Sequence, residues 1–146
     1  MAGTFRCVVV VPTRKLFDQD VYYASVPSED GMFGVLPGHE LLVSLNGESG
    51  VVTLNLDEAG KEQEKFLLFN GSAQMYNGIL TVLGIFGKNV KTIDAAEIEE
   101  RSRELKAQIA EMESLADDVQ DKAEIEFEKR KLRWFEIQLD YARNAN

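Results

Sequence analysis

Glycine and proline divide the chain into two unlike parts. All 11 glycines and all 3 prolines lie within residues 1–87, and the last of them is Gly87. These residues mark turns because glycine tolerates positive φ and proline fixes φ, whereas both are costly inside helices. A turn-rich first part, residues 1–87, and a helical second part, residues 88–146, are therefore expected.

The first part has the pattern of short strands separated by turn residues. Turn signals recur about every 8 to 12 residues, as in a β-sandwich or barrel. Three Asn-Gly pairs favour tight turns between paired strands, and the stretch 57–60 predicts a longer polar hairpin. The pairs are Asn46-Gly47, Asn70-Gly71 and Asn77-Gly78. Strands are expected at 5–11, 21–26, 32–36, 41–45, 50–56, 64–69, 73–76 and 79–85.

The second part has the period of helices. From Asp94 onward, apolar residues recur at spacings of seven, four, three and four, which places them on one helix face. Asp94 is a candidate N-cap, with Glu97 three residues further on. Two helices are expected, 94–115 and 122–143, and their equal lengths and short link predict an antiparallel hairpin. The two apolar stripes are Ile98, Leu105, Ile109, Met112, Ala116 and Ile125, Leu132, Phe135, Leu139, Ala142. The predicted fold class is α+β: an N-terminal antiparallel β-sandwich followed by a C-terminal antiparallel α-helical hairpin.

Composition excludes several classes of function. With 45% apolar residues the chain has enough material for a core, and its net charge of −9 argues against nucleic acid or anionic lipid as a partner. No run approaches the roughly 20 apolar residues of a membrane helix, so direct membrane insertion is not expected. The amino terminus lacks a signal pattern, which predicts a cytosolic chain. The single cysteine, Cys7, is interpreted as a core residue.

The sequence offers no catalytic constellation. The one histidine, His39, has no selected nucleophile or metal-ligand partner, so it is interpreted as a structural or interface residue. Residues 84–89 superficially resemble a phosphate-binding loop, but only two residues separate Gly84 from Gly87 and no hydroxyl follows Lys88. No catalytic residue, metal or cofactor is expected.

Four cations stand close together in the acidic second part: Lys129, Arg130, Lys131 and Arg133. Either they form a solvated helix face or they bind an acidic surface of a partner, and the spacing does not decide between these explanations. Trp134 follows directly and is an apolar side chain of the kind enriched at interfaces.

One motif is familiar. The stretch Gly31-Met32-Phe33-Gly34-Val35-Leu36-Pro37-Gly38-His39, followed by a glycine-punctuated β region and a terminal helical hairpin, resembles the epsilon subunit of the rotary F-type ATP synthases. The resemblance covers the whole chain. It implies a β-sandwich of about ten strands and a non-catalytic rotor subunit of the central stalk.

The resemblance also implies partners and their contacts. The expected partners are the gamma subunit, the c-ring and the alpha/beta catalytic head. A turn carrying Met32, Phe33 and Gly34 would lie near the c-ring, and His39 would lie near gamma. The hairpin would inhibit ATP hydrolysis, with Lys129, Arg130, Lys131 and Arg133 facing an acidic segment of the beta subunit. The chain would then be peripheral on the cytoplasmic face of the bacterial plasma membrane.

One position departs from the family pattern. Several members have an arginine three residues after the aspartate at the start of the hairpin, in a motif linked to ATP binding. Here Asp94 keeps the aspartate, but Glu97 stands where the arginine would face the triphosphate. Because like charges repel, Asp94 is a weak ATP candidate, and weak or absent ATP binding is expected.

Two other classes of function remain as alternatives. The first is a free-standing β-sandwich binding module whose helical tail forms a coiled-coil oligomer. The second is an independent hydrolase, which lacks a recognisable base, nucleophile and metal site. A stalk subunit is expected to be monomeric or to bind gamma, whereas a coiled-coil module is expected to self-associate.

Overall fold

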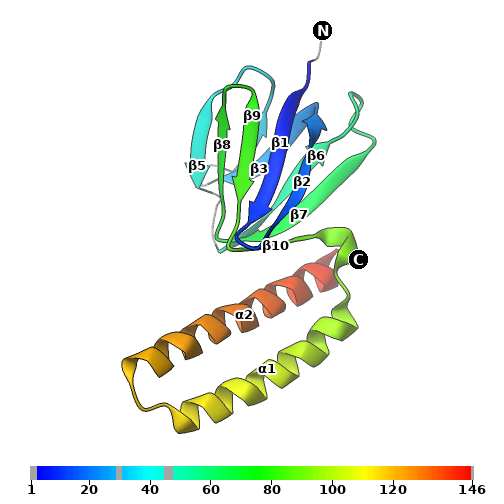
Figure 1. Cartoon of the computed structure of the whole chain (residues 1–146). Coiled ribbons are helices and arrows are strands. Elements are labelled where there is room, and N and C mark those ends of the chain that lie inside the picture. The colour runs from blue at the N-terminus through cyan, green and yellow to red at the C-terminus, as the bar shows by residue number, and fades with distance from the viewer. Residues whose placement is uncertain (1–2, 29–30, 45–47, 146) are drawn as a thin grey trace. The chain divides into compact units, whose positions relative to one another are not determined.

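The computed structural model describes residues 3–28, 31–44 and 48–145. The chain forms two compact units, Met1–Thr92 and Ile93–Asn146. The first unit is a β-sandwich and the second a pair of helices (Figure 1). The strands are β1 (Phe5–Val11), β2 (Arg14–Val21), β3 (Tyr23–Ser28), β4 (Gly31–Val35), β5 (Leu41–Ser44), β6 (Ser49–Asn55), β7 (Gln63–Phe69), β8 (Ser72–Tyr76), β9 (Ile79–Leu83) and β10 (Phe86–Asn89).

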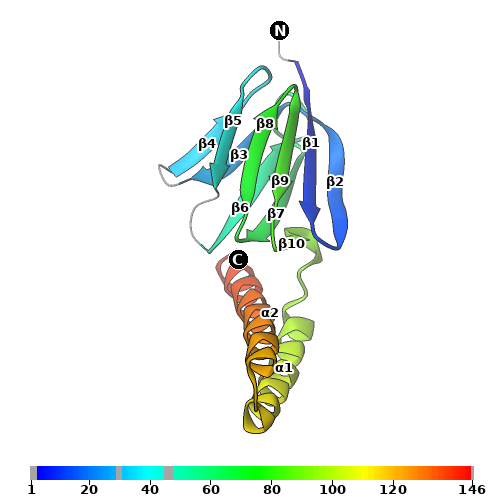
Figure 2. The same cartoon turned by 60° about the vertical axis from the view of Figure 1, so that its left-hand side comes forward.

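The sandwich consists of two five-stranded sheets. Sheet A has the strand order β2-β1-β9-β8-β5, and sheet B has the order β10-β7-β6-β3-β4 (Figure 2). The expected antiparallel arrangement holds for all described pairs except one, because β1 and β9 run parallel. That parallel pair joins the first strand to a late one and places β1 inside sheet A.

The core lies between the two sheets. In β1, burial alternates along the strand, so that Phe5, Cys7 and Val9 point inward. From the opposite sheet, Phe66 meets Phe17 edge to face, with ring centroids 5.6 Å apart. Each such fully buried apolar side chain contributes about 1.5 to 3 kcal/mol. The prediction that Cys7 is a core residue is confirmed, since its side chain is fully buried.

The three Asn-Gly pairs differ in the connections that they form. Asn77 and Gly78 both adopt positive φ, 54° and 81°, and form the tight β8–β9 hairpin turn that was predicted. Asn70 also has positive φ, but it connects β7 in sheet B to β8 in sheet A, so the predicted hairpin there is wrong. Asn46-Gly47 lies outside the described residues.

Two strands were not predicted as such. The strand β2 has few apolar residues. Phe17 and Val21 are buried, Leu16 is partly buried against the core, and the rest of this edge strand is polar. The strand β10 is short, and it pairs with β7 from Phe86 to Asn89. A 3-10 turn, Val90–Thr92, follows it, so the first compact unit ends at Thr92, five residues beyond the boundary expected at Gly87.

The second unit contains α1 (Ala95–Leu115) and α2 (Val119–Asn144). Asp94 caps α1 as predicted, because its carboxylate accepts the N–H of Glu97 at 3.3 Å. The helix α2 begins three residues earlier than predicted, since Asp118 caps it by accepting the N–H of Asp121. Among the described residues, neither helix has the length and apolar character needed to span a bilayer.

The two helices pack against each other through the predicted stripes. Leu105, Ile109 and Ile125 are buried together, with Met112, Ala116, Leu132 and Phe135 around them. The predicted apolar stripe did not include Ser102, yet its side chain is buried between those of Ile98 and Leu105. Ion pairs join the helices at two levels, Lys129 with Glu113 at 3.7 Å and Arg143 with Glu99 at 3.8 Å.

Candidate partner-binding surfaces

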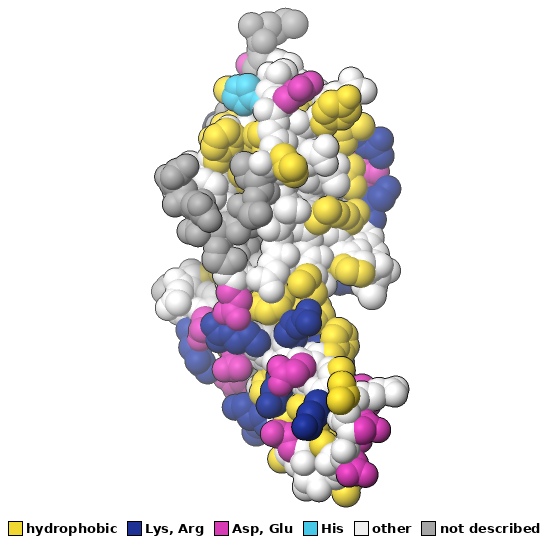
Figure 3. Space-filling view, turned by 90° about the vertical axis from the view of Figure 1, so that its left-hand side faces the viewer, with side chains coloured by type: hydrophobic (Ala, Val, Ile, Leu, Met, Phe, Trp, Pro, Cys, Tyr) yellow, Lys and Arg dark blue, Asp and Glu magenta, His cyan; other side chains and the backbone are white. Residues whose placement is uncertain are grey.

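The outer face of sheet A carries uncovered apolar side chains. Four of them stand on three adjacent strands, and their exposed fractions are Leu42 75%, Tyr76 62%, Ile79 36% and Leu83 47%. Tyr76 and Ile79 are direct cross-strand partners. We call these four residues the sheet A face. Figure 3 shows hydrophobic side chains at several places on the sandwich surface, whereas charged side chains are dense on the helices.

An ionic cluster lies on the neighbouring strands of the same sheet. The guanidinium of Arg6 donates two hydrogen bonds of 2.8 Å to the carboxylate of Asp18, and Lys15 donates a third at 3.0 Å. These hydrogen bonds hold the pKa of Asp18 well below its ordinary range. Arg6 is the β1 partner of Ile79, so the ionic cluster borders the apolar face.

The sheet A face was missed in the sequence, although β9 carries a signal for it. A half-buried strand alternates apolar and polar residues. In β9, Leu80 and Val82 point into the core, yet Ile79 and Leu83 on the other side are also apolar. Apolar residues on both sides of a strand are typical of strands that are covered on both faces, although Thr81 also lies on this outer side of β9.

The residues Met32, Phe33 and Gly34 lie on strand β4 and not on a turn, which corrects the expectation drawn from the resemblance. The strand is an edge of sheet B. Met32 is 62% exposed and Phe33 39% exposed, so both are accessible at this edge. At Gly34 a Cβ would overlap the hydroxyl of Tyr23, so the glycine leaves room for that ring.

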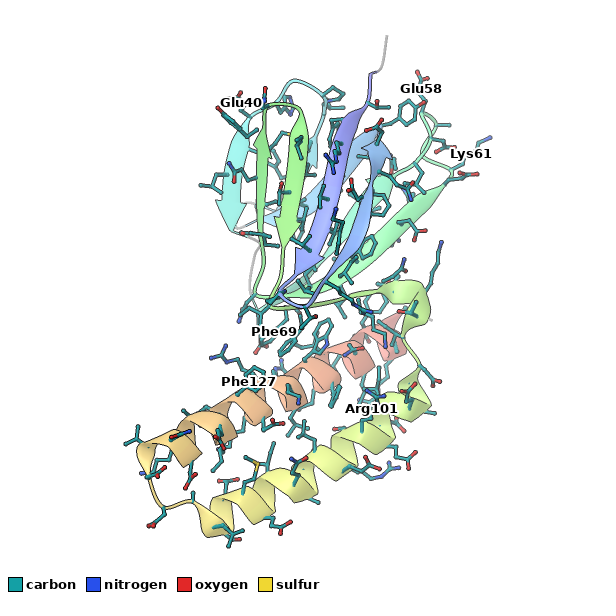
Figure 4. All side chains as sticks on the ribbon, in the orientation of Figure 1. Glu40, Glu58, Lys61, Phe69, Arg101 and Phe127 are labelled. Atoms are coloured by element: carbon teal, nitrogen blue, oxygen red, sulfur yellow. The ribbon has the colours of Figure 1, made fainter. Side chains whose placement is uncertain are left out.

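His39 stabilises the turn that connects β4 to β5. Its Nδ1 accepts the N–H of Leu36 at 3.4 Å, and its own N–H donates to the carbonyl of Leu36 at 3.3 Å. The imidazole is exposed. Figure 4 labels the next residue, Glu40, at this end of the sandwich. The side chain is therefore both a turn-stabilising acceptor and accessible to a partner.

The four cations of the second unit differ in their surroundings. Lys129 lies 3.7 Å from Glu113 and 3.8 Å from Glu126, and Lys131 lies 3.3 Å from Glu128. Arg133 also has an interaction. Among the described residues, no carboxylate forms an ion pair with Arg130, which is exposed. Trp134 is buried, at 8% exposure, and Phe135 packs into the hairpin cluster.

The start of α1 is already occupied by its own side chains. The carboxylate of Asp94 caps the helix, and Glu97 forms an ion pair of 3.0 Å with Arg101. Figure 4 labels Arg101 on α1. A triphosphate at this helix start would meet two carboxylates, one of which is paired with Arg101. Within the described ranges, no group of three or more His, Cys, Asp or Glu side chains has the arrangement of a metal site.

Comparisons with known proteins identify the family. The profile of the ATP synthase delta/epsilon chain β-sandwich domain matches residues 4–84. The chain is 31% identical over 108 residues to the ATP synthase epsilon chain of Pelotomaculum thermopropionicum, covering 73% of this chain and 77% of that one. It is 30% identical over 111 residues to ATP synthase epsilon chain 1 of Nitrobacter hamburgensis. That match covers 76% of this chain and 79% of the relative.

A shorter relative and two solved structures extend the comparison. The ATP synthase epsilon chain of Rickettsia bellii is 26% identical over 110 residues, which are 75% of this chain but all of the relative. Chains in cryo-EM structures of mitochondrial ATP synthases share the fold. That of Euglena gracilis has a TM-score of 0.54 at 14% identity, covering 86% of this chain and 74% of that chain. The chain in the central stalk and c-ring structure of Tetrahymena thermophila has a TM-score of 0.51 at 12% sequence identity. This match covers 92% of the present chain and 95% of the Tetrahymena chain.

The profile match and the two relatives at 30% identity or above show that this chain belongs to the ATP synthase delta/epsilon chain family.

Proposed function

We propose that the chain is the epsilon subunit of an F-type ATP synthase central stalk, a non-catalytic part that couples c-ring rotation to the catalytic head. The family match supports this assignment. The observation that carries the proposal is the sheet A face. Its exposed apolar side chains stand around the polar pair Gln74–Thr81, and a gathering of exposed apolar side chains is typical of a site that a partner covers. The stalk subunit gamma is the partner that we assign to it.

Two further contacts belong to the proposal. The accessible residues Met32 and Phe33 at the edge of sheet B face the c-ring, and His39 lies near gamma. Both sites offer exposed side chains on a rigid sandwich. These partners hold the subunit at the cytoplasmic face of a bacterial plasma membrane as a peripheral protein.

The hairpin is proposed to restrain ATP hydrolysis. The family profile ends at residue 84, before the helices, so this role needs support of its own. Arg130 supplies it, because an exposed cation without an ion pair among the described residues is available to an acidic segment of the beta subunit. Lys129 and Lys131 have to give up their present carboxylate partners to join that contact. Such a contact weakens as salt rises.

The coiled-coil alternative receives no support from the hairpin. A coiled-coil oligomer needs the apolar stripes of the helices free to meet a second copy. Here the stripes of α1 and α2 pack against each other within one chain. The assignment of an intrachain hairpin is therefore more consistent with a stalk subunit than with a self-associating tail.

Sedimentation distinguishes the two functions directly. The purified full-length chain is expected to sediment alone as a monomer and to comigrate at one copy per complex with an F-type ATPase depleted of epsilon. A chain that self-associates and does not comigrate would establish the free-standing binding module instead. Replacing Ala59 with Glu, in the β6–β7 hairpin away from the sheet A face, is a control that leaves comigration unchanged.

A further inference from the structure

Large apolar side chains are exposed where the two helices meet at their connection. Leu115 at the end of α1 is 72% exposed, Val119 at the start of α2 is 83% exposed, and Phe127 is 49% exposed. The buried hairpin cluster does not cover them, because it ends on this side with the partly buried Met112 and Ala116. The connection therefore presents apolar surface that is not used to hold the hairpin together.

Two adjoining cavities hollow this surface. The first has a volume of about 170 Å³ and is lined by Met112, Leu115, Ala116, Asp121, Glu124 and Ile125. The second has a volume of about 410 Å³ and is lined by Met112, Gln120, Ala123, Glu124, Phe127 and Glu128. Met112 and Glu124 line both, so the two cavities adjoin, and we call the pair the tip groove. Both helices contribute to it.

The tip groove has an apolar floor and carboxylate walls. Residues 110–128 contain eight carboxylate side chains and one lysine, a net charge of −7 within a chain whose total is −9. Glu113 and Glu126 share one cation, Lys129, and Glu128 forms an ion pair with Lys131. In the part of the chain that the structure describes, no cation forms an ion pair with Asp121 or Glu124. Two lining carboxylates thus lack a cation among the described side chains, and of these Asp121 accepts the N–H of Asp117 at 3.1 Å.

The ring of Phe127 is contacted by a cation of this chain and is partly open to a partner. The Nζ of Lys131 lies 5.8 Å from its centroid, at cation–π distance. Phe127 lies on α2, where Figure 4 labels it. Since half of this ring is exposed, it can contact an aliphatic or a cationic side chain of a second molecule.

We propose that the tip groove binds a basic amphipathic helix of another protein, with apolar side chains on the floor and lysine or arginine against Asp121 and Glu124. A helix that lays its apolar face into a groove is a recurrent mode of recognition. A second copy of this chain does not fit, because it would bring another surface of net charge −7 against the first. The sheet A face and its partner are not involved, so the proposal does not rest on the stalk assignment.

A titration of the full-length chain with synthetic peptides tests the proposal. The probe is an amidated amphipathic peptide of leucine and lysine, and its matched controls are a scrambled peptide of the same composition and a version with glutamate in place of lysine. In NMR spectra, the basic amphipathic peptide is expected to give saturable shifts at Met112, Ala123 and Phe127. The scrambled and acidic peptides are expected to bind at least tenfold more weakly.

Matched substitutions locate the contact. Phe127→Ala is expected to weaken binding of the basic peptide about tenfold, and Glu124→Gln several-fold. Glu111→Gln removes a charge from the same acidic region without touching the groove, and it is expected to change the affinity less than twofold. Equal losses for Glu111→Gln and Glu124→Gln, equal binding of the scrambled peptide, or no saturable binding would each overturn the proposal. Circular dichroism verifies that each variant remains folded.

Discussion

The ring of Tyr23 occupies the space in which a side chain at residue 34 would stand. A Cβ added to Gly34 would lie 2.8 Å from Cζ of Tyr23 and overlap its hydroxyl. The two residues lie on neighbouring strands, because Gly34 is paired with Ser25 in β3. Since Gly34 does not have positive φ, packing rather than backbone conformation requires the glycine.

Gly34→Ala is therefore expected to destabilise the chain by about 1 to 3 kcal/mol, as overpacking does. In a Tyr23→Ala background the same substitution is expected to be nearly neutral, because the clashing ring is absent. Urea unfolding of the four chains gives the coupling free energy. Equal effects of Gly34→Ala in both backgrounds would show that Tyr23 does not constrain this position.

The N-cap of α1 predicts a second effect. Asp94→Ala removes the acceptor of the Glu97 N–H and is expected to cost about 1 kcal/mol of helix stability. Asp94→Asn keeps an acceptor and serves as the control, with a smaller loss. The measurement is thermal unfolding followed at the helix band of the circular dichroism spectrum. A loss for Asn equal to that for Ala would contradict the capping role.

ATP binding offers a test at the same position. Because Glu97 forms an ion pair with Arg101 and Asp94 caps the helix, the isolated chain is expected to show no stoichiometric ATP binding in calorimetric titration. Glu97→Arg brings the sequence closer to the family pattern and is the informative variant. Tight ATP binding by the unsubstituted chain would contradict the account of this junction.

The carboxylate of Asp18 predicts a specific pH dependence. The Arg6 and Lys15 hydrogen bonds depress its pKa in the folded chain, well below the ordinary value of about 3.9. A depressed folded-state pKa contributes stability above the unfolded-state pKa, and this contribution is lost as the pH falls below about 4. In NMR titration of the side-chain carboxyl carbon, Arg6→Gln is expected to raise this pKa. Lys61→Gln, at the β6–β7 hairpin, is expected to leave it unchanged.

The sequence predicted those elements whose residues repeat with a clear period. The strand at 5–11 and the helix starting after Asp94 appear as predicted, since alternation in one and capping in the other are local signals. The strand β2 was missed, because an edge strand needs few apolar residues: Phe17 and Val21 are its buried side chains, and Leu16 is partly buried. The Asn70-Gly71 turn was misassigned because an Asn-Gly pair sets local backbone geometry and cannot tell a hairpin from a passage between sheets.

The candidate site was predicted less completely than the fold. The motif around Met32 and His39 led to the prediction of partner-binding residues in the sandwich, which stays a prediction. The sheet A face, in contrast, depends on which strands become neighbours. Leu42 on β5 and Tyr76 on β8 come together only because β5 pairs with β8. Long-range pairing of this kind leaves no local pattern in the sequence.

The attachment of the sandwich to the stalk is the central claim, and an activity titration tests it most directly. An F-type ATPase depleted of epsilon is titrated with the full-length chain while ATP hydrolysis is measured, and Leu42→Glu is compared with the Ala59→Glu control. Leu42→Glu places a charge on the sheet A face, so the account predicts a midpoint at least tenfold higher with the same final inhibition. Identical midpoints for Leu42→Glu and Ala59→Glu would contradict it.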